Sequence, residues 1–211
     1  QLNASRPDIS FDLAIGGRRD VAGEGGLGTN TIEDRFLTSR SNWRYAEFDG
    51  SAVPADWTFG FDASGWSEGQ AEFGFGDTPE GATEPVEGTV LPPADVWYFR
   101  TSFETPSDNA RGDYDELVLR LLVDDGASVY LNGHELLRPD LPGTLGTPNA
   151  TSDRPLRLQS GEDEFYFDEF TFPLGANETI DAEELVQVTS ALPASLLEPS
   201  GQTNVLAVAV Y

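Results

Sequence analysis

The chain has 211 residues, with 37 acidic residues against 12 basic ones and a formal net charge of -25. All basic residues are arginines, and the chain contains no cysteine and no methionine. This composition excludes disulfides and zinc–thiolate sites, and the charge repels nucleic acids and anionic membranes. The excess of carboxylates favours cations and is typical of an acidic protein adapted to a salty, halophilic environment.

The first predicted element is an N-terminal strand over residues 7–17. Apolar residues alternate with polar or small ones, so that one face carries Ile9, Phe11, Leu13 and Ile15. A Gly-rich loop is expected over residues 18–30. Residues 1–40 are therefore interpreted as a strand followed by a linker.

The remainder, residues 41–211, is interpreted as one β-domain. Aromatic residues stand among Gly, Asp and Ser from residue 43 to residue 77, which is typical of loop-rich β structure. Strands are predicted at 96–103 and 204–211, and the second is apolar on both faces. Short strands with turn signals between them favour a β-sandwich of the jelly-roll type.

The segment 117–133 is expected to hold the centre of the core. Its first half is a strand that is apolar on both faces, and Asp124-Asp125-Gly126 supplies turn residues. A returning strand is followed by the turn dipeptide Asn132-Gly133. We predict a β-hairpin closed by the Asp-Asp-Gly segment, with a second turn at its far end.

Several motifs taken together resemble the galactose-binding-like jelly-roll modules. Such modules include the sugar-binding domains of β-galactosidase-type glycoside hydrolases and ancillary modules of bacterial secreted proteins. The matching residues are Trp57, Phe61-Asp62, Trp66, and the runs 73–77, 98–103, 124–133 and 203–208. The resemblance spans about residues 41–211 and implies a jelly-roll sandwich preceded by an extra N-terminal strand. It does not specify a function, because related folds carry different sites.

Candidate ligands for a calcium ion are carboxylates. Asp124-Asp125 also resembles the paired-aspartate motif of the yeast flocculin-type lectin domain, in which adjacent aspartates hold Ca²⁺ beside the sugar. The alternative is that Asp-Asp-Gly only forms the turn. Asp163 and Asp168, in an acidic strand predicted over residues 162–172, form a second candidate cation site, whose alternative is a solvated strand face.

Glycan recognition needs aromatic rings and hydrogen-bonding side chains. The predicted ligand-binding residues are Asp124, Asp125, Tyr130, Asn132 and Trp97. Most tryptophans of such a fold are expected in the core. The chain has a single histidine, His134, and no nucleophile-elbow or phosphate-binding motif, so the sequence argues against an enzyme.

An extracellular location is expected from the first residue of the chain and from its sequons. The chain begins at Gln1, which favours a processed mature product, and sequons stand at Asn3, Asn149 and Asn177. No run is long and apolar enough to span a membrane.

Three functional hypotheses remain open. The first is a non-catalytic carbohydrate-binding or adhesion module that recognises a glycan or cell-surface polymer. The second is a self-assembling filament or surface-layer subunit whose strand Ile9 to Ile15 pairs with the sheet edge of a neighbouring copy; the alternative is that this strand folds onto its own sandwich. The third is an accessory domain of a secreted enzyme.

Overall fold

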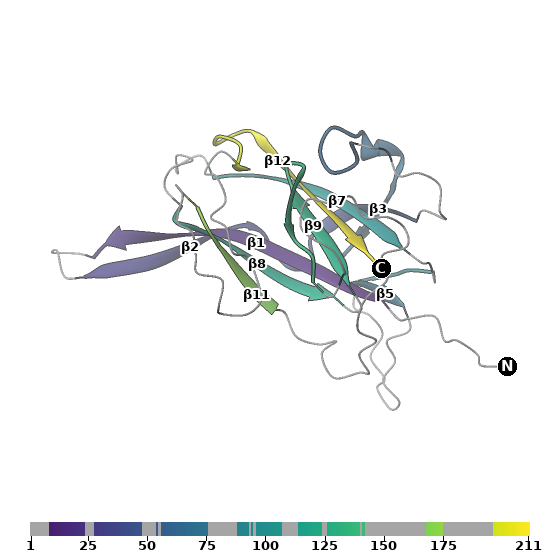
Figure 1. Ribbon diagram of the computed structural model, residues 1–211, viewed down its shortest axis with the longest axis horizontal. Coiled ribbons are helices and arrows are strands. Elements are labelled where there is room, and N and C mark those ends of the chain that lie inside the picture. Colours follow the sequence, from purple (N-terminus) through teal and green to yellow (C-terminus); the bar gives the residue numbers. More distant parts are fainter. Residues whose placement is uncertain are drawn as a thin grey trace, which may run out of the picture.

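The computed structural model is a sandwich of two β-sheets (Figure 1). It describes residues 9–23, 28–47, 54, 56–75, 88–92, 94, 96–106, 114–123, 126–139, 141, 168–174 and 196–211. Within these ranges the only helical element with defined bounds is the short 3-10 turn η2, Ala63–Gly65. No helix in the described ranges has the length and apolarity needed to cross a membrane. The predicted all-β sandwich is confirmed.

Two sheets with different strand orders make up the sandwich. Sheet A is 6-stranded, in the order β11-β8-β1-β5-β6, and β2 pairs with β1 beside that path. Sheet B is also 6-stranded, in the order β10-β9-β12-β7-β3-β4. The strands of sheet A are β1 (Ile9–Ala22), β2 (Thr29–Leu37), β5 (Phe73–Phe75), β6 (Thr89–Val90), β8 (Glu116–Val123) and β11 (Asp168–Pro173). Those of sheet B are β3 (Asn42–Glu47), β4 (Ser67–Gln70), β7 (Trp97–Glu104), β9 (Ala127–Leu131), β10 (His134–Leu137) and β12 (Thr203–Val210).

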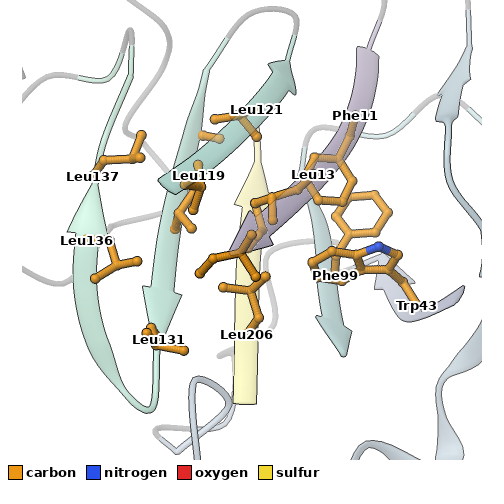
Figure 2. Packing of buried hydrophobic residues seen from close by; sticks show 14 of the residues in the cluster. Phe11, Leu13, Trp43, Phe99, Leu119, Leu121, Leu131, Leu136, Leu137 and Leu206 are labelled. Atoms are coloured by element: carbon orange, nitrogen blue, oxygen red, sulfur yellow. The ribbon is translucent and has the colours of Figure 1, made fainter. Parts of the chain in front are cut away.

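The core lies between the facing sides of the two sheets (Figure 2). Phe11 on β1 contacts the rings of Trp43 on β3 and Phe99 on β7, with centroids 5.2 and 4.5 Å apart. All three side chains are at most 1% exposed. Because burying one large apolar side chain contributes about 1.5–3 kcal/mol, contacts of this kind join the sheets more firmly than any surface ion pair.

The N-terminal strand belongs to the sandwich itself. β1 pairs with β8 from Phe11 to Arg18 and with β5 from Ile9 to Phe11. Phe11, Leu13 and Ile15 are buried in the core of their own chain. The sequence leaves two positions open for this strand, in its own sandwich or at the sheet edge of a neighbouring copy. The structure shows it in its own sandwich.

The loop predicted for residues 18–30 is wrong at both ends. β1 continues to Ala22 and β2 begins at Thr29, so these segments form a long hairpin whose far end projects beyond the rest of the sandwich (Figure 1). Gly17 is required inside the strand, because a Cβ there would lie 2.4 Å from the Tyr114 ring and 2.6 Å from the Phe36 ring. Gly17 thus marks a place where aromatic rings approach the backbone of the strand.

The predicted hairpin across Asp124-Asp125-Gly126 is also wrong. β8 pairs with β1 and β11 in sheet A, whereas β9 pairs with β12 and β10 in sheet B. The segment after Val123 therefore leads from one sheet to the other.

The turn at Asn132-Gly133 is confirmed. It joins β9 to β10, and both residues have positive φ, 48° and 83°. Two residues with positive φ define the tight hairpin turn whose twist matches that of the flanking strands, which explains the preference for Asn-Gly.

Candidate functional site

A groove of about 660 Å³ lies on the outer face of sheet B. Strands β3, β7 and β12 form its floor, and the segment 61–64 forms a wall. Its lining residues are Asn42, Trp43, Arg44, Phe61, Asp62, Ala63, Ser64, Glu68, Gly69, Arg100, Thr101, Ser102, Thr203 and Val205. The groove exists because residues 57–64 lie over the outer face of the sheet, where Arg44 and Arg100 contact their backbone.

Side chains reach this face because alternate residues of a strand point to opposite sides. Trp43, Tyr45 and Phe99 point into the core, so Arg44 and Arg100 point outward. The ladder places Arg100 opposite Arg44, and Arg44 opposite Glu68 on β4. One row across the sheet therefore carries two guanidinium groups and a carboxylate.

The Arg100 guanidinium holds the covering segment in place. Its two terminal nitrogens donate hydrogen bonds to the backbone oxygens of Trp57 and Phe59. Burial lowers the pKa of Arg100 from its ordinary value, and the nearby carboxylate of Asp56 acts in the opposite direction. Arg100 stays cationic, because an arginine does not lose its proton at neutral pH.

Arg44 holds the other end of the same segment. Its Nη1 donates to the backbone oxygen of Ser64 at 3.0 Å and approaches that of Ala63 at 3.5 Å. Its Nη2 forms an ion pair with Glu68. The two arginines thus attach the segment 57–64 to the sheet at two points.

Asp62 brings a carboxylate to the groove wall. Its Oδ1 accepts a hydrogen bond from the Ser64 amide at 2.9 Å and caps the short turn η2. Hydrogen bonds from Ser64 lower the pKa of Asp62, so this side chain is ionised at neutral pH. The carboxylate lies in the solvent-exposed part of the wall.

Aromatic rings stand at the groove. Phe61 lines it and packs on Trp66, with ring centroids 5.5 Å apart. Phe59 does not line the groove; it is 47% exposed, and its Cβ lies 3.3 Å from the position that a Cβ of Gly133 would take. Neither Phe59 nor Phe61 was among the ligand-binding residues predicted from the sequence. The pattern that could have indicated them is a pair of aromatic residues separated by one glycine, Phe59-Gly60-Phe61.

Tyr130, a predicted ligand-binding residue, lies in the row of the two arginines. It is opposite Ala207 on β12, and Ala207 is in turn opposite Arg100. Its ring meets that of Trp57 edge to face at 5.4 Å. Trp57 also packs on Tyr98, and burial raises the pKa of Tyr98 to about 12. Tyr130 therefore lies in an aromatic cluster beside the groove.

Trp97 and Asn132, also predicted to bind ligand, make contacts inside the protein. Trp97 is 4% exposed and packs against Tyr45 at a centroid distance of 5.7 Å. The Asn132 amide nitrogen donates to the Leu196 carbonyl at 2.7 Å and to Asn204 Oδ1 at 2.9 Å. The structure places neither side chain in the groove.

The predicted metal ligands are not brought together by the described part of the chain. Asp124, Asp125 and Asp163 lie outside the described residues, as do the sequons at Asn3, Asn149 and Asn177. Asp168 is exposed at the start of β11, opposite Leu121 in sheet A. Within the described ranges, no group of three or more His, Asp or Glu side chains is arranged to hold a metal ion.

Comparisons with family models, curated proteins and solved structures found no match to this chain. The groove must therefore be interpreted from its own chemistry. Its arginines supply hydrogen-bond donors and the Asp62 carboxylate supplies an acceptor. The Asn42 amide can donate and accept, and Phe61 adds an aromatic ring. Such a set can bind a polar ligand with many hydroxyl groups.

Proposed function

We propose that this protein is a non-catalytic carbohydrate-binding module of the cell exterior and that the groove on sheet B is its glycan site. The single observation that carries the proposal is the composition of this groove, which combines Arg44, Arg100, Asp62 and Asn42 with the ring of Phe61. A module of this kind would attach its host to a glycan or another cell-surface polymer.

Sugars present hydroxyl groups that both donate and accept, next to faces of aliphatic C–H groups. The floor arginines donate, Asp62 accepts, and an aromatic ring packs on the apolar face of a sugar. The guanidinium groups are already fixed by backbone oxygens, which reduces the entropy lost when a ligand binds. A groove of this size accommodates a few sugar units.

The resemblance to galactose-binding-like jelly-roll modules is compatible with this function but does not specify it. The two-sheet sandwich is compatible with that fold, and the segment Trp57 to Trp66, part of the resemblance, builds one side of the groove. The proposal includes a structural Ca²⁺ ion bound by Asp124 and Asp125. It also includes the extracellular location and the glycosylation that the sequence suggests.

A glycan array screened with the purified chain, in millimolar Ca²⁺ and again in excess chelator, tests this function. Phe61→Ala should reduce the affinity for a bound glycan about two- to tenfold, because stacking on an aromatic ring contributes about 0.5–1.5 kcal/mol. Val90→Ala is the matched control, since Val90 is 69% exposed on β6 of sheet A. An array without any signal above background would contradict the proposal, and equal binding in chelator would remove calcium from it.

Self-assembly is a second candidate, favoured by the projecting end of the β1–β2 hairpin (Figure 1). Among the described strands, β2 pairs only with β1, and Ile32 on it is 39% exposed. In the donor-strand version of this hypothesis, residues 9–15 would pair with a neighbouring copy instead of with β5 and β8. Light scattering after size-exclusion chromatography, with and without Ca²⁺, should then show polymers. Ile32→Asp or removal of residues 1–17 should abolish these polymers. A monomer in both conditions would contradict assembly.

A further inference from the structure

The two arginines of the groove are direct neighbours in the ladder of sheet B. Arg44 on β3 and Arg100 on β7 are Cα partners, and both point away from the core. Like charges placed directly opposite each other on adjacent strands destabilise a sheet. In a chain with 12 arginines and 37 acidic residues, an arginine opposite another arginine is unusual, because acidic residues outnumber arginines about threefold.

Sheet A shows how the same protein neutralises neighbouring arginines elsewhere. Arg18 on β1 and Arg120 on β8 share Glu33 and Glu169, and Arg18 also pairs with Glu116. The shortest of these contacts joins Arg120 Nη1 to Glu33 Oε1 at 2.6 Å. Arg18 and Arg120 are therefore each in contact with at least two carboxylates.

The groove has less of this compensation. Within the described residues Arg44 forms one ion pair, with Glu68, and Arg100 forms none and donates to two backbone oxygens. The carboxylates of Asp62 and Asp56 act on Arg44 and Arg100 without forming an ion pair with them. Asp62, the other carboxylate of the lining, is engaged by Ser64. The described residues accept from two of the five N–H groups of Arg100, which leaves other donors of this side chain for a ligand.

We propose that the groove is selective for acidic glycans and that the carboxylate of a uronic acid unit binds between Arg44 and Arg100. The terminal nitrogens of both guanidinium groups already contact protein oxygens, so a ligand carboxylate would accept from their remaining N–H groups. It would supply the negative charge that relieves the repulsion between the two arginines. This inference rests on the proposed glycan-binding function and names the class of sugar that the site takes.

The net charge of -25 does not prevent such binding. At physiological ionic strength the Debye length is about 8 Å, so carboxylates elsewhere on the surface are largely screened from the ligand. The contacts to Arg44 and Arg100 are direct and are screened much less. Binding should therefore require moderate salt and should persist in a salty medium.

The test is calorimetric titration with a polyuronate, with the same polymer after reduction of its carboxyl groups, and with a sulfated neutral polysaccharide. We expect binding to the polyuronate and at least tenfold weaker binding to the reduced polymer. Equal affinity for the two would overturn the inference but leave glycan binding intact, whereas no binding to either would contradict the glycan site as well. Equally tight binding of the sulfated polymer would overturn the assignment to a carboxylate.

Variants connect the selectivity to the arginines. Arg44→Gln should lower the affinity for the polyuronate about tenfold, whereas Arg35→Gln, the same charge change at an exposed site on β2, should leave it unchanged. Arg100→Lys retains the charge but loses the fork, and it should weaken binding while thermal unfolding shows an intact fold. Equal effects of Arg44→Gln and Arg35→Gln would indicate a general charge effect and overturn the proposed site.

Discussion

Asp12 shows how a single residue departs from what its sequence position suggests. It occupies a polar position of the alternating pattern of β1, yet it is only 3% exposed. Its carboxylate accepts hydrogen bonds from the backbone amides of Leu13 at 2.7 Å and of Arg40 at 3.0 and 3.2 Å. Burial raises the pKa of Asp12 to about 6, with a smaller contribution from Glu72, although the two amides act in the opposite direction.

A raised pKa means that the folded state binds this proton more tightly than the unfolded state does. Stability contributed by Asp12 is therefore lost as the pH rises from about 4 to about 6, and the full cost, about 3 kcal/mol, is present above that range. Asp12→Asn removes this titration. Between pH 4.5 and 7.5, we expect the wild type to lose about 2 kcal/mol of unfolding free energy relative to the variant.

Urea unfolding at both pH values measures this difference, and comparing two variants of one chain cancels the titration of the other carboxylates. The side chains of Ser10 and Glu72 remain in both proteins, joined by a hydrogen bond of 3.2 Å. Parallel pH profiles for wild type and Asp12→Asn would show that Asp12 has an ordinary pKa.

The β9–β10 hairpin is held at its turn by the side chain of Asn132. Besides the bonds to Leu196 and Asn204, its Oδ1 accepts the backbone N–H of Val205 at 2.8 Å. These bonds join the turn to the start of β12, which lies between β9 and β7. A residue chosen by turn propensity thus also connects elements far apart in the sequence.

Two substitutions separate the contributions of Asn132. Asn132→Gly keeps a residue suited to positive φ but removes the side-chain hydrogen bonds, and we expect it to cost about 2–3 kcal/mol of unfolding free energy. Asn132→Ala should cost about 1 kcal/mol more, because alanine is strained at a φ of 48°. Denaturant unfolding gives both values, and an alanine variant as stable as the glycine variant would contradict the backbone contribution.

At the scale of the whole molecule, charge repulsion opposes the compact state. The net charge of -25 should make stability depend on salt, since screening weakens this repulsion. The ion pairs of sheet A weaken in salt as well, but they are partly exposed and each contributes only about 0–1 kcal/mol.

We therefore expect the midpoint of thermal unfolding at pH 7 to rise by several degrees between low salt and about 1 M NaCl. The control is the same series near the isoelectric point of about 4.1, where the net charge is close to zero and the increase should almost disappear. A midpoint that falls with salt at pH 7 would show that the ion pairs outweigh the repulsion.

Local patterns in the sequence were enough to identify several elements. Alternation along residues 9–15 indicated a strand with a buried face, the run at 204–211 indicated a central strand, and Asn132-Gly133 indicated the hairpin turn. These features depend on the backbone preferences of a few adjacent residues and on the alternation of side chains along a strand. Both can be read from the sequence alone. The two-sheet, all-β class followed from them.

Tertiary structure alone decided which strands are neighbours and where the groove lies. Asp124-Asp125-Gly126 has the chemistry of a hairpin turn, yet β8 and β9 entered different sheets because strand pairing is decided by which apolar faces find cover. The groove needs Arg44 opposite Arg100, 56 residues apart in the numbering, and a covering segment held by both. No local pattern predicts that pairing, because the register of two distant strands depends on the packing of the whole sandwich.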